Sequence, residues 1–325
     1  MKKDFPFWIG FNFFEGIGPL RFRLLLEYFG SAQKAWEASS RKLRAIGLNF
    51  KLVEKFASFR AWFKPEKIDF KKKDWNIQYD RFPWFKQVKN YQKYSQGKIL
   101  ILTLKDKLYP PLLKEIPDAP PLLYVKCGMR NEKMINEQID KLFKGPAIAV
   151  VGSRKATNYG GEITCKLVSQ LVRKDLVIVS GMAKGIDGLA HRTALKNRGE
   201  TIAVLGSGIN VIYPYQNKDI YQKIVEGKNT KGLIISEFPP FYPPLPGNFP
   251  IRNRIISGLS KAVLVIEAAR KSGSLITARL AAEQGKDVFA VPGPITSQLS
   301  AGTSYLISQG AKLVSSAQDI LEEIY

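Results

Sequence analysis

The sequence predicts an α/β protein built on a doubly wound, mostly parallel sheet. From residue 147 onward, short apolar runs that are typical of buried strands alternate with stretches that have the apolar spacing of amphipathic helices. Polar residues hardly interrupt the runs, which indicates strands covered by helices on both faces of the sheet. The predicted strands are 147–151, 176–180, 201–205, 232–236, 262–267 and 287–291, and the predicted helices are 159–174, 185–198, 217–226, 251–259 and 274–284.

The first 65 residues have a helical pattern instead, and we expect residues 1–65 to form a separate small domain. The predicted helices are 20–29, 32–38, 40–46 and 51–63. The turn Gly16-Ile17-Gly18-Pro19 is similar to the hairpin of helix-hairpin-helix modules, in which backbone N–H groups contact a phosphate. A turn that only packs the helices together would use glycine in the same way.

Residues 66–144 are rich in aromatic and basic side chains, and we assign them to the same domain as the sheet, so that this domain covers residues 66–325. Rings that alternate with cations can stack on nucleobases, but aromatic residues more commonly fill a core. The residues concerned are Lys71, Lys72, Lys73, Trp75, Tyr79, Phe82, Trp84, Phe85, Tyr91 and Tyr94. Two further strands are predicted at 98–104 and 122–125, and the prolines between them place this pair at an edge of the sheet.

The charge of the chain favours a polyanionic partner. The 50 Lys and Arg residues against 28 Asp and Glu residues give a formal net charge of +22. Nucleic acid is the first candidate partner for such a basic chain, and an anionic membrane surface is the second. A genome that encodes lysine-rich proteins throughout is the alternative explanation of the charge.

The composition also limits the compartment and the chemistry. No apolar run reaches the roughly 20 residues that a membrane span needs, and the N-terminus is a poor signal peptide because Asp4 and Glu15 interrupt its apolar stretch. Two cysteines cannot form a framework of several disulfides, and a single histidine rules out a histidine-based metal cluster. We therefore expect a cytoplasmic protein with no bound metal and no membrane insertion.

The loops that follow three of the predicted strands are basic and rich in small residues. In open α/β sheets the ligand lies at the carboxyl ends of the strands, where the N–H groups and dipoles of the following helices favour anions. Arg154, Lys184, Arg270 and Lys271 add full positive charges. We therefore predict a phosphate-binding site made of Gly152, Ser153, Arg154, Gly181, Lys184, Gly185, Lys271, Ser272, Gly273, Ser274 and Thr277.

A fourth loop combines an aromatic ring with arginines. Phe249 lies in a proline-rich stretch just before Arg252 and Arg254, so a base could stack on the ring while the arginines bind phosphates. Burial of Phe249 against the edge of the sheet is the open alternative.

An enzymatic function has weaker support in the sequence. The stretch 206–211 carries only the first two of the three glycines of the dinucleotide fingerprint, and no P-loop motif occurs. Asp187 and His191 share a helix face and could be combined with Ser153 or Ser180 as a hydrolytic triad. We prefer structural roles, with Asp187 as a helix cap and His191 as a hydrogen-bonding group. We therefore expect neither catalysis nor a cofactor.

Seven ordered sequence blocks resemble the DprA/Smf family. They include V-G-S-R-x-x-x-x-Y-G at 151–160, S-G-M-A-K-G-I-D-G-L-A-H at 180–191, P-G-N-F-P-I-R-N-R-I-I-S-G-L-S at 246–260 and E-A-A-R-K-S-G-S-L-I-T-A-R at 267–279. The similarity is dense over about 145–315, and the segment 109–124 extends it toward the N-terminus.

The resemblance implies an extended Rossmann-like domain with its core at about 145–315, preceded by a small helical domain similar to a sterile alpha motif. It also implies a non-catalytic homodimer that binds single-stranded DNA without strong sequence preference and loads a RecA-type recombinase during natural transformation. Family members bind DNA at the glycine-serine-arginine loop, here Gly152 to Arg154, and at a basic pocket near Arg252, Asn253 and Arg254.

Two further expectations concern the C-terminus and the alternative function. Many family members continue into a C-terminal winged-helix-like domain, whereas this chain ends at Tyr325 just after a predicted helix, so we expect no such domain here. The alternative is a nucleotide-binding enzyme similar to phosphoribohydrolases, which have a related fold. The P-G-G-x-G-T-x-x-E pattern of those enzymes is absent from this sequence.

Overall fold

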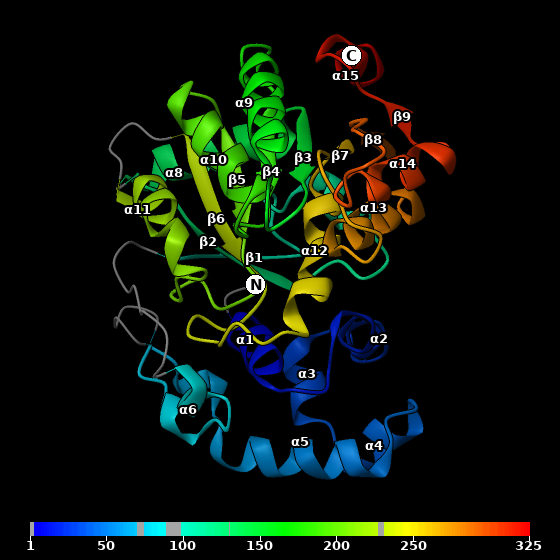
Figure 1. Cartoon of the computed structure of the whole chain (residues 1–325). Coiled ribbons are helices and arrows are strands. Elements are labelled where there is room, and N and C mark those ends of the chain that lie inside the picture. Colours follow the sequence, from blue (N-terminus) through cyan, green and yellow to red (C-terminus); the bar gives the residue numbers. More distant parts are fainter. Residues whose placement is uncertain (1–2, 70–74, 89–98, 130, 227–230) are drawn as a thin grey trace.

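The centre of the molecule is one sheet with helices on both faces (Figure 1); the computed structural model describes residues 3–69, 75–88, 99–129, 131–226 and 231–325. The strand order is β1-β2-β6-β5-β4-β3-β7-β8-β9. Neighbouring strands from β6 to β9 in this order are parallel, and β1 and β2 are added antiparallel beside β6. The strands are β1 Leu100–Thr103, β2 Leu122–Lys126, β3 Ala147–Val151, β4 Val177–Ser180, β5 Thr201–Val204, β6 Gly232–Ser236, β7 Ala262–Val265, β8 Asp287–Ala290 and β9 Lys312–Leu313.

The predicted doubly wound sheet is confirmed. All six strands predicted after residue 147 form, and the predicted edge pair corresponds to β1 and β2, although Lys98 lies outside the described residues. The chain winds outward from β3 in one direction through β4, β5 and β6, and in the other through β7, β8 and β9. The boundary between β3 and β7 is therefore the switch point of the sheet, where folds of this class bind their ligands.

Helices cover both faces because alternate strand residues point to opposite sides. Val177 and Val179 pack in a core with α8, α12 and α13, whereas Ile178 packs in a core with α9, α10 and α15. Each aliphatic side chain that is fully buried in these cores contributes roughly 1.5–3 kcal/mol to folding. The helices that follow residue 130 are α8 Glu132–Lys144, α9 Asn158–Val172, α10 Ile186–Lys196, α11 Lys218–Glu226, α12 Asn248–Gly258, α13 Gly273–Glu283, α14 Ala301–Ser308 and α15 Gln318–Ile324.

The helices predicted between residues 159 and 284 are confirmed with ends shifted by at most three residues. The described helices that were not predicted are α1, α6 Phe85–Val88, α7 Pro111–Lys114, α8 and α14, and the sequence accounts for two of these omissions. The first, α8, lies in the segment that the sequence marked only as aromatic and basic, yet Ile135, Ile139 and Leu142 form a buried stripe at helical spacing. The second, α1, is buried on almost every side and therefore has no amphipathic period.

The N-terminal helices lie below the sheet in Figure 1, at the end where α12 begins. They are α1 Phe5–Phe13, α2 Pro19–Phe29, α3 Ala32–Glu37, α4 Ser40–Ala45 and α5 Phe50–Trp62. The side chains of Ser31, Ser39 and Asn49 cap the last three by accepting a hydrogen bond from a backbone N–H of the first turn. The four helices predicted in this region are confirmed with small shifts of their ends.

An aromatic core joins these helices to the sheet. Trp75 stacks on Tyr124 of β2 with ring centroids 5.9 Å apart, and Tyr79 meets Phe241 at 5.0 Å. Trp75, Tyr79, Phe82 and Trp84 are all buried, so ordinary core packing is the correct interpretation for them and a base-stacking surface is not. Lys71 to Lys73, Tyr91 and Tyr94 lie outside the described residues. The domain boundary at residue 65 stays a prediction.

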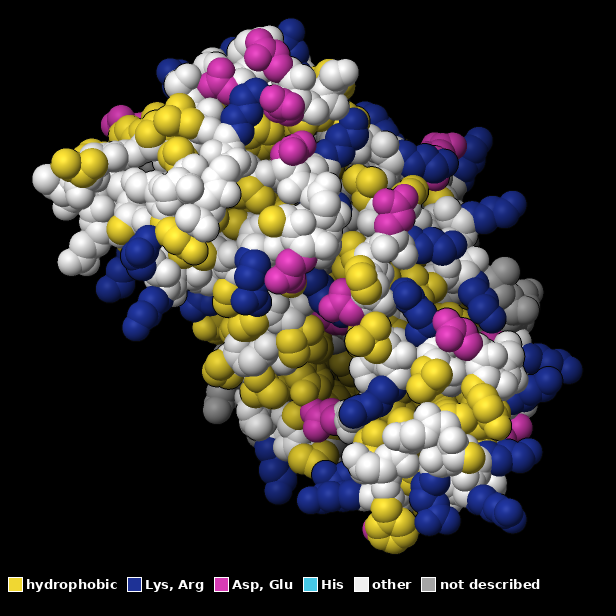
Figure 2. All heavy atoms as spheres, turned by 90° about the vertical axis from the view of Figure 1, so that its right-hand side faces the viewer, with side chains coloured by type: hydrophobic (Ala, Val, Ile, Leu, Met, Phe, Trp, Pro, Cys, Tyr) yellow, Lys and Arg dark blue, Asp and Glu magenta, His cyan; other side chains and the backbone are white. Residues whose placement is uncertain are grey.

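The face that carries α2, α12 and α13 has an apolar hollow near its middle, with both basic and acidic side chains around its margin (Figure 2). A groove of about 620 Å³ on this face is lined by Leu20 of α2, Ile251 of α12, and Ile276 and Leu280 of α13. Among the described helices, none is both long and apolar enough to cross a membrane.

Candidate nucleic-acid interface

A pocket of about 420 Å³ lies at the switch point of the sheet, beyond the carboxyl ends of β3 and β7. Its walls come from the loop after β3, the start of α12 and the start of α13. Eleven of the predicted site residues line it, namely Gly152, Ser153, Arg154, Asp187, Phe249, Arg252, Asn253, Ser272, Gly273, Ser274 and Thr277. Gly181, Lys184, Gly185, Arg254 and Lys271 lie outside its lining.

The loop after β3 is held on both sides by backbone hydrogen bonds. The Ser153 N–H donates to the carbonyl oxygen of Glu267 at 2.8 Å, and the Ser153 carbonyl oxygen accepts from the N–H of Ile186 at 3.1 Å. The Ser153 hydroxyl in turn bonds to the backbone of Lys155. This anchoring leaves the side chains of Arg154 and Lys155 exposed at the pocket. Lys155 was not predicted, although it directly follows the glycine-serine-arginine loop.

Gly185 has a structural role in this anchoring. Its φ is +72°, and a Cβ atom there would lie 2.2 Å from the carbonyl oxygen of Ser153. Only glycine allows the loop before α10 to pack this closely on the loop after β3. We therefore correct the prediction of Gly185 as a phosphate ligand, because the residue shapes the loops rather than lining the pocket.

An arginine and an aromatic ring lie at the rim of the pocket, and a second ring from outside the pocket lining packs on the first. The guanidinium carbon of Arg154 lies 5.6 Å from the centroid of the Phe249 ring, and the Tyr213 ring meets the Phe249 ring at 5.6 Å. Phe249 is half-buried, so it partly packs on the sheet edge and partly remains accessible. Tyr213 is 39% exposed and was not predicted, because it lies in the loop after β5, whose sequence carries an incomplete dinucleotide fingerprint and no arginine or lysine.

Arg252 lies at the buried base of the pocket and not at its exposed rim. Its Nη1 donates to the carbonyl oxygens of Gly181, at 2.6 Å, and of Val204. Burial lowers the pKa of Arg252 to about 10, so the guanidinium is still charged at neutral pH. The side chain ties together the loops after β4 and β5 and adds positive charge below the pocket, so the predicted direct phosphate contact is corrected to this supporting position.

Arg254 is separated from the pocket and neutralised by carboxylates. It makes a two-point ion pair with Glu237, at 2.6 and 2.7 Å, and its Nε lies 3.0 Å from an oxygen of Asp118. The side chain is buried, and its charge is already balanced. The prediction that Arg254 binds a phosphate is therefore corrected, since its donors are committed to these partners.

The starts of the three helices are less open to anions than predicted. At α9 the Glu267 carboxylate accepts from Thr157, and before α10 the Asp187 carboxylate accepts from the N–H groups of Gly181 and Ala183. At α13 the Ser272 hydroxyl accepts from the N–H of Ser274. Much of the available positive charge therefore comes from the side chains of Arg154 and Lys155. Lys184 and Lys271 are exposed outside the lining.

Asp187, His191 and Ser180, which could in principle be combined as a hydrolytic triad, each form hydrogen bonds with other groups. His191 is fully buried, its Nδ1 bonds to the Thr201 hydroxyl at 2.7 Å, and burial lowers its pKa to about 3. Burial raises the pKa of Asp187, whose carboxylate accepts from two loop amides. The Ser180 hydroxyl donates to the carbonyl oxygen of Val150 at 2.7 Å. These contacts do not pair the carboxylate, the imidazole and the serine hydroxyl with one another; His191 meets Ser180 only through the Ser180 backbone.

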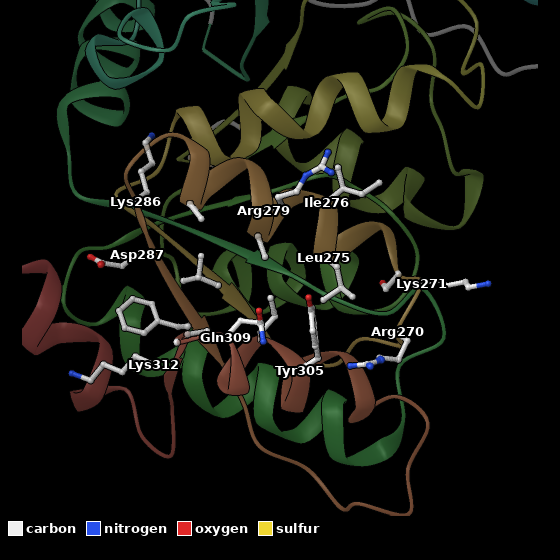
Figure 3. Close-up of a pocket in the computed structure, with 18 of the residues that line it drawn as sticks. Arg270, Lys271, Leu275, Ile276, Arg279, Lys286, Asp287, Tyr305, Gln309 and Lys312 are labelled. Atoms are coloured by element: carbon white, nitrogen blue, oxygen red, sulfur yellow. The ribbon is translucent and has the colours of Figure 1, made fainter.

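A second, larger cavity of about 810 Å³ lies on the other side of α13 (Figure 3). Arg270, whose guanidinium carbon lies 4.6 Å from the Tyr305 ring, stands at one end, and Lys312 of β9 stands at the other. Leu275 of α13 and Phe289 of β8 contribute apolar walls. No pattern in the sequence predicted this cavity.

The strand order and the cationic pocket at the switch point define the class, a Rossmann-like α/β protein with a basic ligand edge. The sequence model of the family described as "DNA recombination-mediator protein A" matches residues 100–325. The chain is 37% identical to protein Smf of Synechocystis over 99% of this chain and 73% of that protein. It is 46% identical to DNA processing protein DprA of Streptococcus pneumoniae over 72% of this chain and 76% of that protein. The chain therefore belongs to the DprA/Smf family of DNA recombination mediators, which confirms the resemblance.

Solved structures agree with this assignment. The X-ray structure of DprA from Streptococcus pneumoniae matches with a TM-score of 0.73 and 37% identity, covering 95% of this chain and 94% of that chain. DprA from Helicobacter pylori, whose structure was described for its single-stranded DNA binding mode, matches with a TM-score of 0.60 and 30% identity. That match covers 71% of this chain and all of the other. The predicted fold, an extended α/β sheet preceded by a helical region, is confirmed.

Proposed function

We propose that this protein binds single-stranded DNA at the pocket between β3 and β7 and acts as a non-catalytic recombination mediator. The observation that carries the proposal is the exposed guanidinium of Arg154 beside the accessible ring of Phe249, 5.6 Å away, at the ligand edge of the sheet. A cation next to a ring offers one contact for a phosphate and one for a base, which is the combination that single-stranded nucleic acid requires. The Helicobacter pylori relative, described as a single-stranded DNA binder, supports the choice of this ligand.

In this proposal the residues of the rim have different tasks. Arg154 and Lys155 bind backbone phosphates, and Phe249 with Tyr213 offers ring faces on which bases stack. Ser272, Gly273, Ser274 and Thr277 at the start of α13, with Asn253, supply polar contacts inside the pocket. Arg252 adds charge from below without leaving its backbone partners. Ring stacking and phosphate contact depend little on base identity, so binding is not sequence-specific.

Family membership supports a proposal for the partners and the setting of the protein. We infer that the protein loads a RecA-type recombinase onto the bound strand in the cytoplasm during natural transformation. We also infer a homodimer formed at the cavity of Figure 3, because Tyr305 exposes apolar surface there and the short edge strand β9 borders the cavity through Lys312.

The test is a fluorescence-anisotropy titration of the full chain with oligo(dT) across salt concentrations. Arg154→Ala should weaken binding and reduce the slope of log affinity against log salt by about one unit for each phosphate that is no longer bound. Arg173→Ala is the matched control, because Arg173 is an exposed arginine at the opposite end of α9. Unchanged affinity and slope in folded Arg154→Ala protein, or equal affinity for double-stranded DNA, would refute the proposal.

A further inference from the structure

The carboxylate of Glu267 occupies the start of α9. Glu267 follows shortly after β7 in sequence and lies across the switch point from the loop after β3. Its Oε2 accepts a hydrogen bond from the backbone N–H of Thr157 at 3.0 Å, and its Oε1 accepts from the Thr157 hydroxyl at 2.5 Å. Thr157 is the N-cap of α9, so the carboxylate lies where the helix dipole is most positive. The side chain is 4% exposed.

The first turn of α9 is shaped around this carboxylate. A Cβ atom at Gly160 would lie 2.2 Å from Oε2 of Glu267 and 2.5 Å from its Cδ. Any larger residue at this position would displace the carboxylate from the helix. The backbone carbonyl of Glu267 also accepts from the N–H of Ser153, so one residue fixes both ends of the loop that carries Arg154 and Lys155.

This position is the one in which doubly wound folds usually hold a ligand phosphate. In that class the phosphate of a nucleotide lies at the switch point, against the N-terminus of the helix that follows the first strand. Here the chain's own carboxylate fills the space and supplies the negative charge. A second anion placed beside it would be repelled in a region that is screened poorly by water.

We propose that Glu267 is a specificity-determining residue: it supplies the anion at the start of α9 and thereby closes this part of the switch-point crevice, beside the open pocket, to the phosphates of free nucleotides. A polynucleotide does not need the start of α9, because Arg154 and Lys155 meet its phosphates at the rim of the neighbouring pocket. This last step rests on the proposed function, whereas the closure of the crevice does not. The internal carboxylate is thus a physical reason why a doubly wound fold, which commonly binds nucleotides, would bind single-stranded DNA and not a free nucleotide.

The closure can be tested by removing the internal anion from the full chain. Glu267→Ala deletes one methylene group and the carboxylate, which together have the size of acetate. The variant should be less stable than the wild type, and acetate or inorganic phosphate should raise its Tm by roughly 2 °C or more above the effect of chloride at equal ionic strength. Wild-type protein should show no such excess. Glu267→Gln, which keeps the volume, should not gain the response.

The matched control is Thr164→Ala. Thr164 is fully buried in the same helix and donates to the carbonyl oxygen of Gly160, so its replacement destabilises α9 without opening its N-terminus. If acetate and phosphate stabilise Glu267→Ala no more than Thr164→Ala, the proposal is wrong.

A second measurement on wild-type protein covers the case in which Glu267→Ala does not fold. Isothermal titration with ADP and with pyrophosphate should show no saturable binding at the crevice, and Arg154→Ala is titrated in parallel to remove binding at the rim. Saturable binding of ADP that survives Arg154→Ala overturns the proposal. Neither measurement uses DNA, so a failure of the proposed function would appear in the oligo(dT) titration alone.

Discussion

Three arginines near the pocket differ in what they can bind because they differ in burial. Arg154 is exposed and faces a ring, Arg252 donates to two backbone carbonyls beneath the pocket, and Arg254 is enclosed by two carboxylates. Only the first has a guanidinium that solvent and a ligand can reach. An arginine in a basic motif is thus a DNA contact, a structural support or half of an ion pair according to its surroundings.

The ion pair of Arg254 leads to a prediction about stability. Arg254→Ala leaves the Glu237 carboxylate buried without its main partner, so the free energy of unfolding should fall by about 3–5 kcal/mol. Arg154→Ala should change stability by less than about 0.5 kcal/mol, because its side chain is exposed. Urea unfolding of the two variants measures both values. Similar stability losses for both would contradict the assignment of their roles.

The burial of His191 predicts a pH dependence. Its pKa falls from 6.5 in the unfolded chain to about 3 in the fold, so between these values the unfolded state binds one more proton. Stability should therefore decrease as pH falls from 6.5 toward 3, by about 1.4 kcal/mol per pH unit from this group. Asp187, whose pKa is raised by burial, contributes with the opposite sign.

The contribution of His191 is isolated by comparison with His191→Asn. Urea unfolding between pH 6.5 and 4.5 should give a steeper loss of stability for the wild type than for the variant, because the remaining titrating groups are shared. Parallel curves for the two proteins would show that the histidine does not titrate as described.

At the scale of elements, the loops are ordered by contacts with one another. The loop before α10 packs on the loop after β3 at Gly185, and the start of α9 is tied to the segment after β7 through Glu267. The geometry of the pocket thus depends on residues that do not line it. A substitution at such a contact should affect ligand binding through the position of Arg154.

Gly185→Ala tests this dependence. The new methyl group would collide with the carbonyl of Ser153 at a backbone conformation that alanine rarely adopts, so both stability and oligo(dT) affinity should fall. Gly161→Ala is the matched control, since the nearest atom to a Cβ there is 3.8 Å away and the residue lies inside α9. It should raise stability by about 0.5–1 kcal/mol and leave affinity unchanged. Equal affinities for the two variants would contradict the loop contact.

The sequence predicted the sheet well because the strands are buried on both faces and are therefore plainly apolar. It also located the pocket, since Gly152, Arg154 and Ser272 belong to loops at one edge. It could not predict which helix starts were occupied, because Glu267 lies 110 residues from Thr157 and the contact exists only in the folded sheet. For the same reason the pairing of Arg254 with Glu237 and the ring contact of Tyr213 with Phe249 escaped prediction.

At the scale of the whole molecule, the cavity of Figure 3 predicts the oligomeric state. Tyr305→Glu places a charge in the apolar surface proposed to join two copies, and it should shift the protein toward monomer in sedimentation velocity. Tyr215→Glu is the control, because Tyr215 is also an exposed tyrosine but lies outside that cavity. A monomeric wild-type protein, or identical behaviour of both variants, would refute the proposed dimer surface.

The aromatic core that joins the N-terminal helices to the sheet also determines which part of the molecule intrinsic tryptophan fluorescence measures. All five tryptophans of the chain precede residue 85, and four of them, Trp8, Trp36, Trp75 and Trp84, are buried in the aromatic core shared by the N-terminal helices and the sheet. The strands from β3 to β9 and the pocket contain no indole among their residues. Intrinsic fluorescence therefore follows the N-terminal part of the molecule, whereas far-ultraviolet circular dichroism follows the whole. Comparing the two signals during urea unfolding would show whether the N-terminal helices and the sheet unfold in one transition or in two.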